Sequence, residues 1–162
     1  MRTASAALAI ALLWLAHGSL AARAEVSNLT GIGAILPVVE TLSEEAEYCG
    51  LSVNGINGTI EGALGASRLR IADAGVFLYV NVLTAYTATV DYCISSINVE
   101  LVVPQTVRLN ATHRRVLANL TLWEIGGVFG SAREQHREQV LGMVQNYARQ
   151  FVAAWTKAQN GR

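Results

Sequence analysis

Three stretches in the middle of the chain alternate between apolar and polar residues, which predicts β-strands. The first runs from Val76 to Tyr86, and its even-numbered apolar residues share one face. After a turn over residues 87–91, a second strand has an apolar face made of Cys93, Ile97, Val99, Leu101 and Val103. A polar turn at 110–114 leads to a third strand over 115–123. Shorter strands are predicted at 68–71 and at 34–42, the latter an edge strand because Pro37 cannot donate a ladder hydrogen bond.

Two other segments have the period of an amphipathic helix. Ser52 is a favoured N-cap for a helix over 53–66, whose apolar face contains Val53, Ile56, Ile60, Ala63 and Leu64. Ser131-x-x-Glu134 has the spacing of a capping box before a helix of about 25 residues, with a stripe made of Val140, Val144, Tyr147, Ala148, Phe151 and Trp155. The acidic segment 43–47 predicts a turn, and residues 25–33 show no periodicity.

These elements follow the order β-α-β-β-β-β-α and predict an α+β fold. The sheet is expected to have about four to five strands and to be rich in antiparallel pairs, with one short helix and one long C-terminal helix packed on one face. Residues 34–158 are expected to form a single α+β domain, preceded by a flexible lead-in over 25–33.

Residues 1–24 have the features of a secretory signal peptide. Arg2 is followed by an apolar stretch from Ala6 to Ala16, and Ala22-Arg23-Ala24 supplies small residues for signal peptidase. Cleavage before Glu25 leaves 138 residues, and without Arg2 and Arg23 these carry 10 basic and 12 acidic side chains, a formal charge of −2. The sequence therefore predicts a periplasmic or secreted protein, with no nucleic-acid partner and no membrane span after signal removal.

The two cysteines, Cys49 and Cys93, both lie after the predicted cleavage site. Neither is the first residue after that site, so we expect a released protein without a lipid anchor. In an oxidising compartment a pair of cysteines favours one disulfide bond, and two buried free thiols are the alternative. A separation of 44 residues differs from the Cys-x-x-Cys spacing of redox-active pairs, so a structural role is predicted.

Several strand and cap segments resemble those of a group of small exported bacterial proteins of uncharacterised function. The similar segments are Cys49–Ser52, Phe77–Val82, Cys93–Ser95 and Val99–Leu101, followed by the long helix. The order of elements is also similar to that of the N-terminal domain of the Tol-system β-propeller protein and of the curli-assembly lipoprotein. That resemblance implies a periplasmic role in contacts with other envelope proteins, and it supplies no catalytic residues.

Candidate chemistry is sparse outside the predicted signal peptide. His113 and His136 have no second histidine or cysteine at ligand spacing, so neither a metal site nor a cofactor is predicted. Gly31-x-Gly33 starts like a dinucleotide motif, but Leu36 replaces its third glycine. No catalytic residues are assigned. Four Asn-x-Thr triplets would accept glycans only in a eukaryotic secreted protein.

Four glycines recur at helical spacing within residues 53–66 and form a candidate partner surface. This glycine stripe consists of Gly55, Gly58, Gly62 and Gly65. Each glycine inside a helix costs about 1 kcal/mol relative to alanine, so a stripe suggests the close approach of another backbone. The alternatives are that the fold merely tolerates these glycines or that the segment is less helical than predicted.

Charge is also segregated along the chain. Glutamates predominate before residue 62, whereas a possible basic patch consists of Arg68, Arg70, Arg108, Arg114 and Arg115. Such a dipolar surface would steer a charged partner, although ordinary solvated charges explain the same pattern.

Together these features predict an exported, disulfide-bonded, non-catalytic binding domain. The expected partner is another envelope protein or a second copy of the chain. The alternatives are a secreted effector or host-directed factor, or an enzyme with an unrecognised site.

Overall fold

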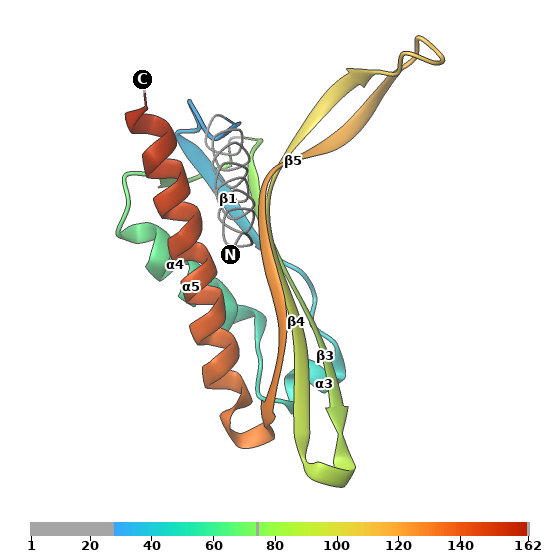
Figure 1. The fold of residues 1–162 in the computed structure, drawn as a ribbon, viewed down its shortest axis with the longest axis vertical. Coiled ribbons are helices and arrows are strands. Elements are labelled where there is room, and N and C mark those ends of the chain that lie inside the picture. Colours follow the sequence, from blue (N-terminus) through green and yellow to red (C-terminus); the bar gives the residue numbers. More distant parts are fainter. Residues whose placement is uncertain (1–27, 74, 162) are drawn as a thin grey trace, which may run out of the picture.

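The computed structural model describes residues 28–73 and 75–161, which form a five-stranded mixed sheet with helices on one side (Figure 1). The strand order is β2-β1-β3-β4-β5. β1 is parallel to both neighbours, and β3, β4 and β5 are antiparallel. The strands are β1 (Ala34–Val39), β2 (Arg70–Ile71), β3 (Phe77–Thr87), β4 (Tyr92–Arg108) and β5 (Arg115–Ala132). The predicted α+β class is confirmed.

Three helices are assigned in the described residues: α3 (Glu44–Tyr48), α4 (Val53–Gly65) and α5 (Arg133–Asn160), together with the 3-10 turn η1 (Ala88–Val90). The Ser52 hydroxyl accepts a hydrogen bond from the backbone N–H of Gly55 at 3.1 Å, which confirms Ser52 as the N-cap of α4. The predicted stripe of α5 is buried along its whole length. α4 and α5 lie beside each other on one face of the sheet (Figure 1).

The core fills the space between this inner face of the sheet and the two helices. Its largest fully buried side chains include Phe151 of α5, Ile56 and Ile60 of α4, Leu78 of β3 and Ile97 of β4. These residues come from every second position of the strands and from one face of each helix. Among residues 28–73 and 75–161, no helix covers the opposite face of β3, β4 and β5.

Three sequence-based predictions were wrong in detail. Residues 43–47, predicted as a turn, form most of α3, which Ser43 caps by accepting from the Ala46 N–H at 3.3 Å. β5 does not stop at residue 123 but continues to Ala132 through glycines that break the alternating pattern. One of them permits a close approach, since a Cβ at Gly126 would lie 2.8 Å from the carbonyl oxygen of Ile97. The capping box is absent because Ala132, not Ser131, is the N-cap of α5.

β1 is an edge strand over only part of its length. β2 pairs with Ala34 and Ile35, and beyond them no described strand pairs with the outer edge of β1. The N–H groups of Leu36 and Glu40 point toward β3, where they donate to Val76 and Val80. Pro37, at an odd position, faces the unpaired side, where its missing N–H costs no hydrogen bond.

Residues 28–33, where the sequence predicted a loose lead-in, are fastened to the C-terminal part of α5. Leu29 is fully buried, and its carbonyl oxygen accepts from the Gln159 amide at 2.8 Å. The Trp155 indole N–H donates to the carbonyl oxygen of Ile32 at 2.7 Å. The predicted signal peptide and residues 25–27 lie outside the described part of the chain.

A β-hairpin extends beyond the rest of the sheet. The last residue of β4 that pairs with β3 is Val102, and from Val103 onward β4 pairs with β5 alone. We call residues 103–120 the arm, and Figure 1 shows it leaving the body of the molecule. Among residues 28–73 and 75–161, no helix has the length and apolarity needed to cross a membrane.

Candidate functional site

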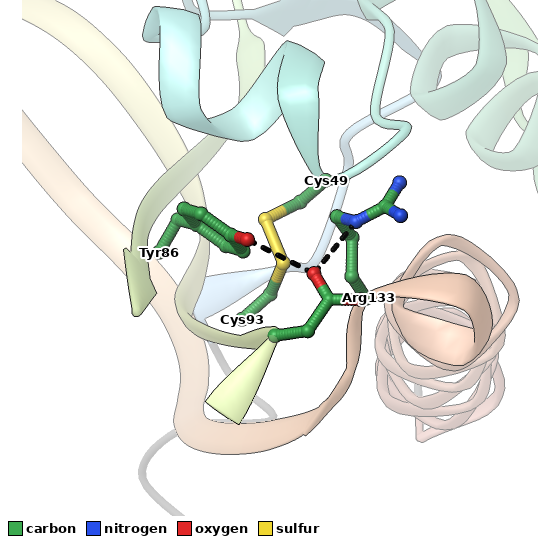
Figure 2. Close-up of polar contacts among 5 residues, drawn as sticks. Cys49, Tyr86, Cys93 and Arg133 are labelled. Carbon is green, nitrogen blue, oxygen red and sulfur yellow. Dashed lines mark hydrogen bonds and ion pairs between the residues drawn. A yellow bond between two sulfur atoms is a disulfide. The ribbon is translucent and has the colours of Figure 1, made fainter. Parts of the chain in front are cut away.

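A disulfide joins Cys49, at the end of α3, to Cys93 at the start of β4 (Figure 2). The two Cα atoms lie 6.3 Å apart, and both residues are buried. Cys93 faces the core, as its place in the alternating pattern predicts. The predicted bridge is confirmed, and it connects the short helix α3 to the end of the β3–β4 hairpin.

Asp91 forms a polar cluster beside this disulfide. Its carboxylate accepts from the Tyr86 hydroxyl at 2.9 Å and from Arg133 Nε at 2.8 Å, as the dashed lines in Figure 2 show. The Arg133 backbone N–H also donates to the Asp91 carbonyl oxygen at 3.1 Å. Asp91 has the left-handed backbone conformation, with φ of 47°, that ends η1. The cluster thus ties the β3–β4 turn to the first residue of α5.

The charges in this cluster shift the acidity of their partners. The hydrogen bond to Asp91 raises the pKa of Tyr86 to about 12. The hydrogen bond from Arg133 is the main cause that lowers the pKa of Asp91. Tyr48 completes the cluster, with its ring 4.7 Å from that of Tyr86 and 5.3 Å from the Arg133 guanidinium carbon. Because the side chains of Asp91 and Arg133 are partly exposed to solvent, we assign the cluster a positioning role rather than a chemical one.

A second polar cluster is buried between the sheet and α5. His136 Nε2 lies 2.8 Å from the Ser95 hydroxyl, and His136 Nδ1 lies 2.9 Å from the Ser131 hydroxyl. Thr84 extends the cluster, since its hydroxyl oxygen is 2.8 Å from that of Ser95. His136 and Ser95 are both fully buried. Although serine and histidine are common catalytic partners, this pair does not face solvent and its hydrogen-bonding capacity is used within the core.

Burial of His136 predicts a pH dependence of stability. Burial lowers the pKa of His136 below its ordinary value of about 6.5. The unfolded chain therefore binds a proton at this histidine more readily than the folded chain does. The contribution of neutral His136 to the free energy of unfolding is fully present above about pH 6.5 and is lost as the pH drops below it. One such group contributes at most about 1.4 kcal/mol per pH unit.

Urea unfolding at pH 7.5 and pH 5.5 measures this effect. The wild type is expected to be less stable at pH 5.5, and His136→Gln should lose most of that difference. His113→Gln is the matched control, because His113 lies exposed in the β4–β5 turn and should leave the difference unchanged. Equal pH dependence in wild type and His136→Gln would contradict the assignment.

The face of the sheet that no other described element covers contains a shallow trough of about 520 Å³. All of its lining residues belong to β3, β4 and β5 except Glu40, which directly follows β1: Glu40, Tyr79, Asn81, Leu83, Ser96, Asn98, Glu100, Val102, Asn119 and Thr121. We call this surface the open face. Its position opposite α4 and α5 follows from the strand alternation that buries Leu78, Val80 and Val82 on the other side.

Amides and carboxylates at the centre of the open face hold one another in place. Asn81 and Asn98 are cross-strand partners on β3 and β4. The Asn81 amide donates to Glu40, and the Asn98 amide donates to Glu100. Thr121 also donates to Glu100, at 3.4 Å. Ordered amides and carboxylates of this kind offer both donors and acceptors to a polar partner.

Exposed apolar side chains lie next to these polar groups. Leu83 of β3 and Val128 of β5 are both cross-strand partners of Ser96 and are 65% and 70% exposed. Ile94 of β4 lies two residues from Ser96 on the same face and is also exposed. The open face thus places exposed apolar side chains beside hydrogen-bonded polar groups.

The structure does not bring the five predicted basic residues together. Arg68 and Arg70 lie near β2, at one edge of the sheet. Arg108, Arg114 and Arg115 lie at the end of the arm, which belongs to β4 and the opposite edge strand β5. The patch therefore divides into two separate groups.

The glycine stripe lies on the solvent side of α4, as its spacing predicted. Gly58, Gly62 and Gly65 are exposed, and a Cβ added at any of them would meet nothing within 4 Å. Gly55 is partly covered, and a Cβ there would lie 3.0 Å from the Ser52 hydroxyl oxygen. These positions remain a predicted partner surface.

Sequence reasoning missed both polar clusters and the open face as a surface. A signal for His136 was available, because it lies four residues before Val140 and so continues the buried stripe of α5. No local signal links Asp91 to Arg133, since they are 42 residues apart and meet through the pairing of Tyr92 with Ala132.

Comparisons with known proteins assign no family. No family model matches the chain, and no curated protein matches it. Among solved structures, it is similar to a minor lipoprotein from Acinetobacter baumannii, with a TM-score of 0.39 and 8% identity over 76% of this chain and 90% of that one. At that TM-score, the similarity supports no conclusion about function.

Proposed function

We propose that this protein is an exported, non-catalytic binding domain that holds a protein partner of the cell envelope on its open face. The observation that carries this proposal is the open face of β3, β4 and β5, which no other described element covers and where exposed Leu83, Ile94 and Val128 lie beside hydrogen-bonded amides. The disulfide suits an oxidising compartment. The serine–histidine cluster, which would be the natural place for chemistry, is enclosed in the core.

Site-specific photo-crosslinking in intact cells tests the proposal. A photoreactive residue placed at Leu83, Ser96 or Val128 samples the open face, and one at Gly62 or Arg149 samples exposed positions on α4 and α5. A discrete adduct is expected from the open-face positions alone. Adducts from Gly62 alone would assign the partner to the glycine stripe, and the absence of any adduct would also contradict the proposal.

A charge-matched pair of variants separates binding from folding. Leu83→Lys with Val128→Lys places two charges on the open face, whereas Gln139→Lys with Gln150→Lys places two charges on exposed positions of α5. Both double variants should unfold at the wild-type temperature, because all four side chains are exposed. Only the first is expected to lose the adduct formed from Ser96.

A further inference from the structure

The arm extends farther than the core requires. Its six cross-strand pairs, from Val103–Leu120 to Arg108–Arg115, add roughly 20 Å to the hairpin beyond the last contact of β4 with β3. A two-stranded ribbon has little stability by itself, and all arm residues are exposed or only partly buried. An extension of this length therefore needs a reason outside the folding of the domain.

The end of the arm is strongly basic. Arg108, Arg114 and Arg115 are all exposed, and the chain has no aspartate or glutamate between Glu100 and Glu124. Within the described residues, none of these three arginines is ion-paired. Arg108 and Arg115 are direct cross-strand partners, an arrangement of like charges that destabilises a hairpin. That cost would be offset by an external anion.

Two exposed leucines accompany the arginines. Leu117 is 75% exposed and lies on the same face of β5 as Arg115, and Leu109, 44% exposed, begins the turn. The backbone N–H of Leu109 donates to the Arg114 carbonyl oxygen at 2.9 Å, so the two residues are adjacent at the base of the turn. Exposed apolar side chains among arginines are the combination that adsorbs to an anionic lipid interface.

We propose that the arm docks onto an anionic phospholipid surface. The arginines would bind lipid phosphates, for which the guanidinium fork is well suited, while Leu109 and Leu117 enter the interface. The acidic helix α3, with Glu44, Glu45 and Glu47, lies toward the opposite end of the molecule from the arm (Figure 1). Repulsion of that end would turn the arm toward the negative surface.

Vesicle co-sedimentation of the purified exported chain tests this proposal. Binding is expected with vesicles that contain one-third phosphatidylglycerol, and not with pure phosphatidylcholine. Arg108→Gln with Arg115→Gln should weaken binding about 25-fold, because each basic side chain near an anionic surface contributes about fivefold. The matched control is Arg68→Gln with Arg70→Gln, which removes equal charge at the other sheet edge and should bind like wild type.

A second variant tests the apolar contribution to lipid binding. Leu117→Ser should weaken vesicle binding while the protein's thermal unfolding stays unchanged, and Val90→Ser, at an exposed apolar position of η1, is its control. If the arm arginine variant failed to fold, Arg114→Gln in the turn would repeat the charge test. Three outcomes would each overturn the proposal. The two double-arginine variants could bind vesicles equally well, the wild type could bind neutral vesicles, or the arm could form a complex with an acidic protein and not bind vesicles.

Discussion

Replacing Cys49 or Cys93 by serine is expected to lower the free energy of unfolding by about 2–5 kcal/mol. The bridge joins residues 44 positions apart, and without it the unfolded chain can adopt more conformations. Cys93 is also fully buried, so a serine hydroxyl there would need a new hydrogen-bond partner. Urea unfolding of the non-reduced proteins measures the difference.

Loss of the disulfide should destabilise α3 more than the rest of the fold. α3 has only five residues, too few for a helix to be stable without tertiary contacts, and Ala46 is its buried anchor. In either cysteine variant, hydrogen exchange should therefore accelerate in α3 more than in α5. Wild type treated with a reductant should behave like the variants, and Thr89→Ser, at an exposed position of η1, should change stability by less than about 0.5 kcal/mol. Wild-type stability in both cysteine variants would contradict this role of the bridge.

Elements with a long, regular pattern were predictable from the sequence. β3 and the first part of β4 alternate over many residues, and α5 repeats its apolar positions over several turns, so errors at single positions hardly matter. α3 was missed because five residues contain too little periodicity. The end of β5 was missed because its glycines have low strand propensity, and pairing with β4 overrides that preference.

The local motif at Ser131 was misread for a different reason. Its spacing to Glu134 matches a capping box, but the hydroxyl binds the ring of His136 instead. A buried histidine ring must satisfy two nitrogens, and that demand outweighs one capping bond at an accessible helix start. Burial in the folded structure decides which partner the Ser131 hydroxyl binds, and the spacing of Ser131 and Glu134 in the sequence does not reveal that burial.

The open face could be predicted only in part. Ser96, Asn98 and Glu100 alternate with the apolar residues of β4, so their position away from the core was visible in the sequence. The residues that lie beside them on β5 were not predictable, because the register between β4 and β5 shifts at Leu101 and Val102. A shift of one residue reverses the face that every later side chain occupies. Thr121 and Asn119 therefore join the open face only through a bulge that the sequence does not indicate.

Replacing Phe151 by alanine should cost about 3–5 kcal/mol, a loss as large as that of the disulfide. Phe151 is fully buried on α5, and its ring meets that of Trp123 on β5 edge-to-face at 5.3 Å. Truncation removes this contact and leaves a cavity between helix and sheet, the interface that closes the core. Phe151→Leu should cost less because it refills part of that volume. Gln150→Ala, at the neighbouring exposed position, should stay within about 0.5 kcal/mol of wild type. A loss below about 1 kcal/mol in Phe151→Ala would mean that α5 does not pack on the sheet in this way.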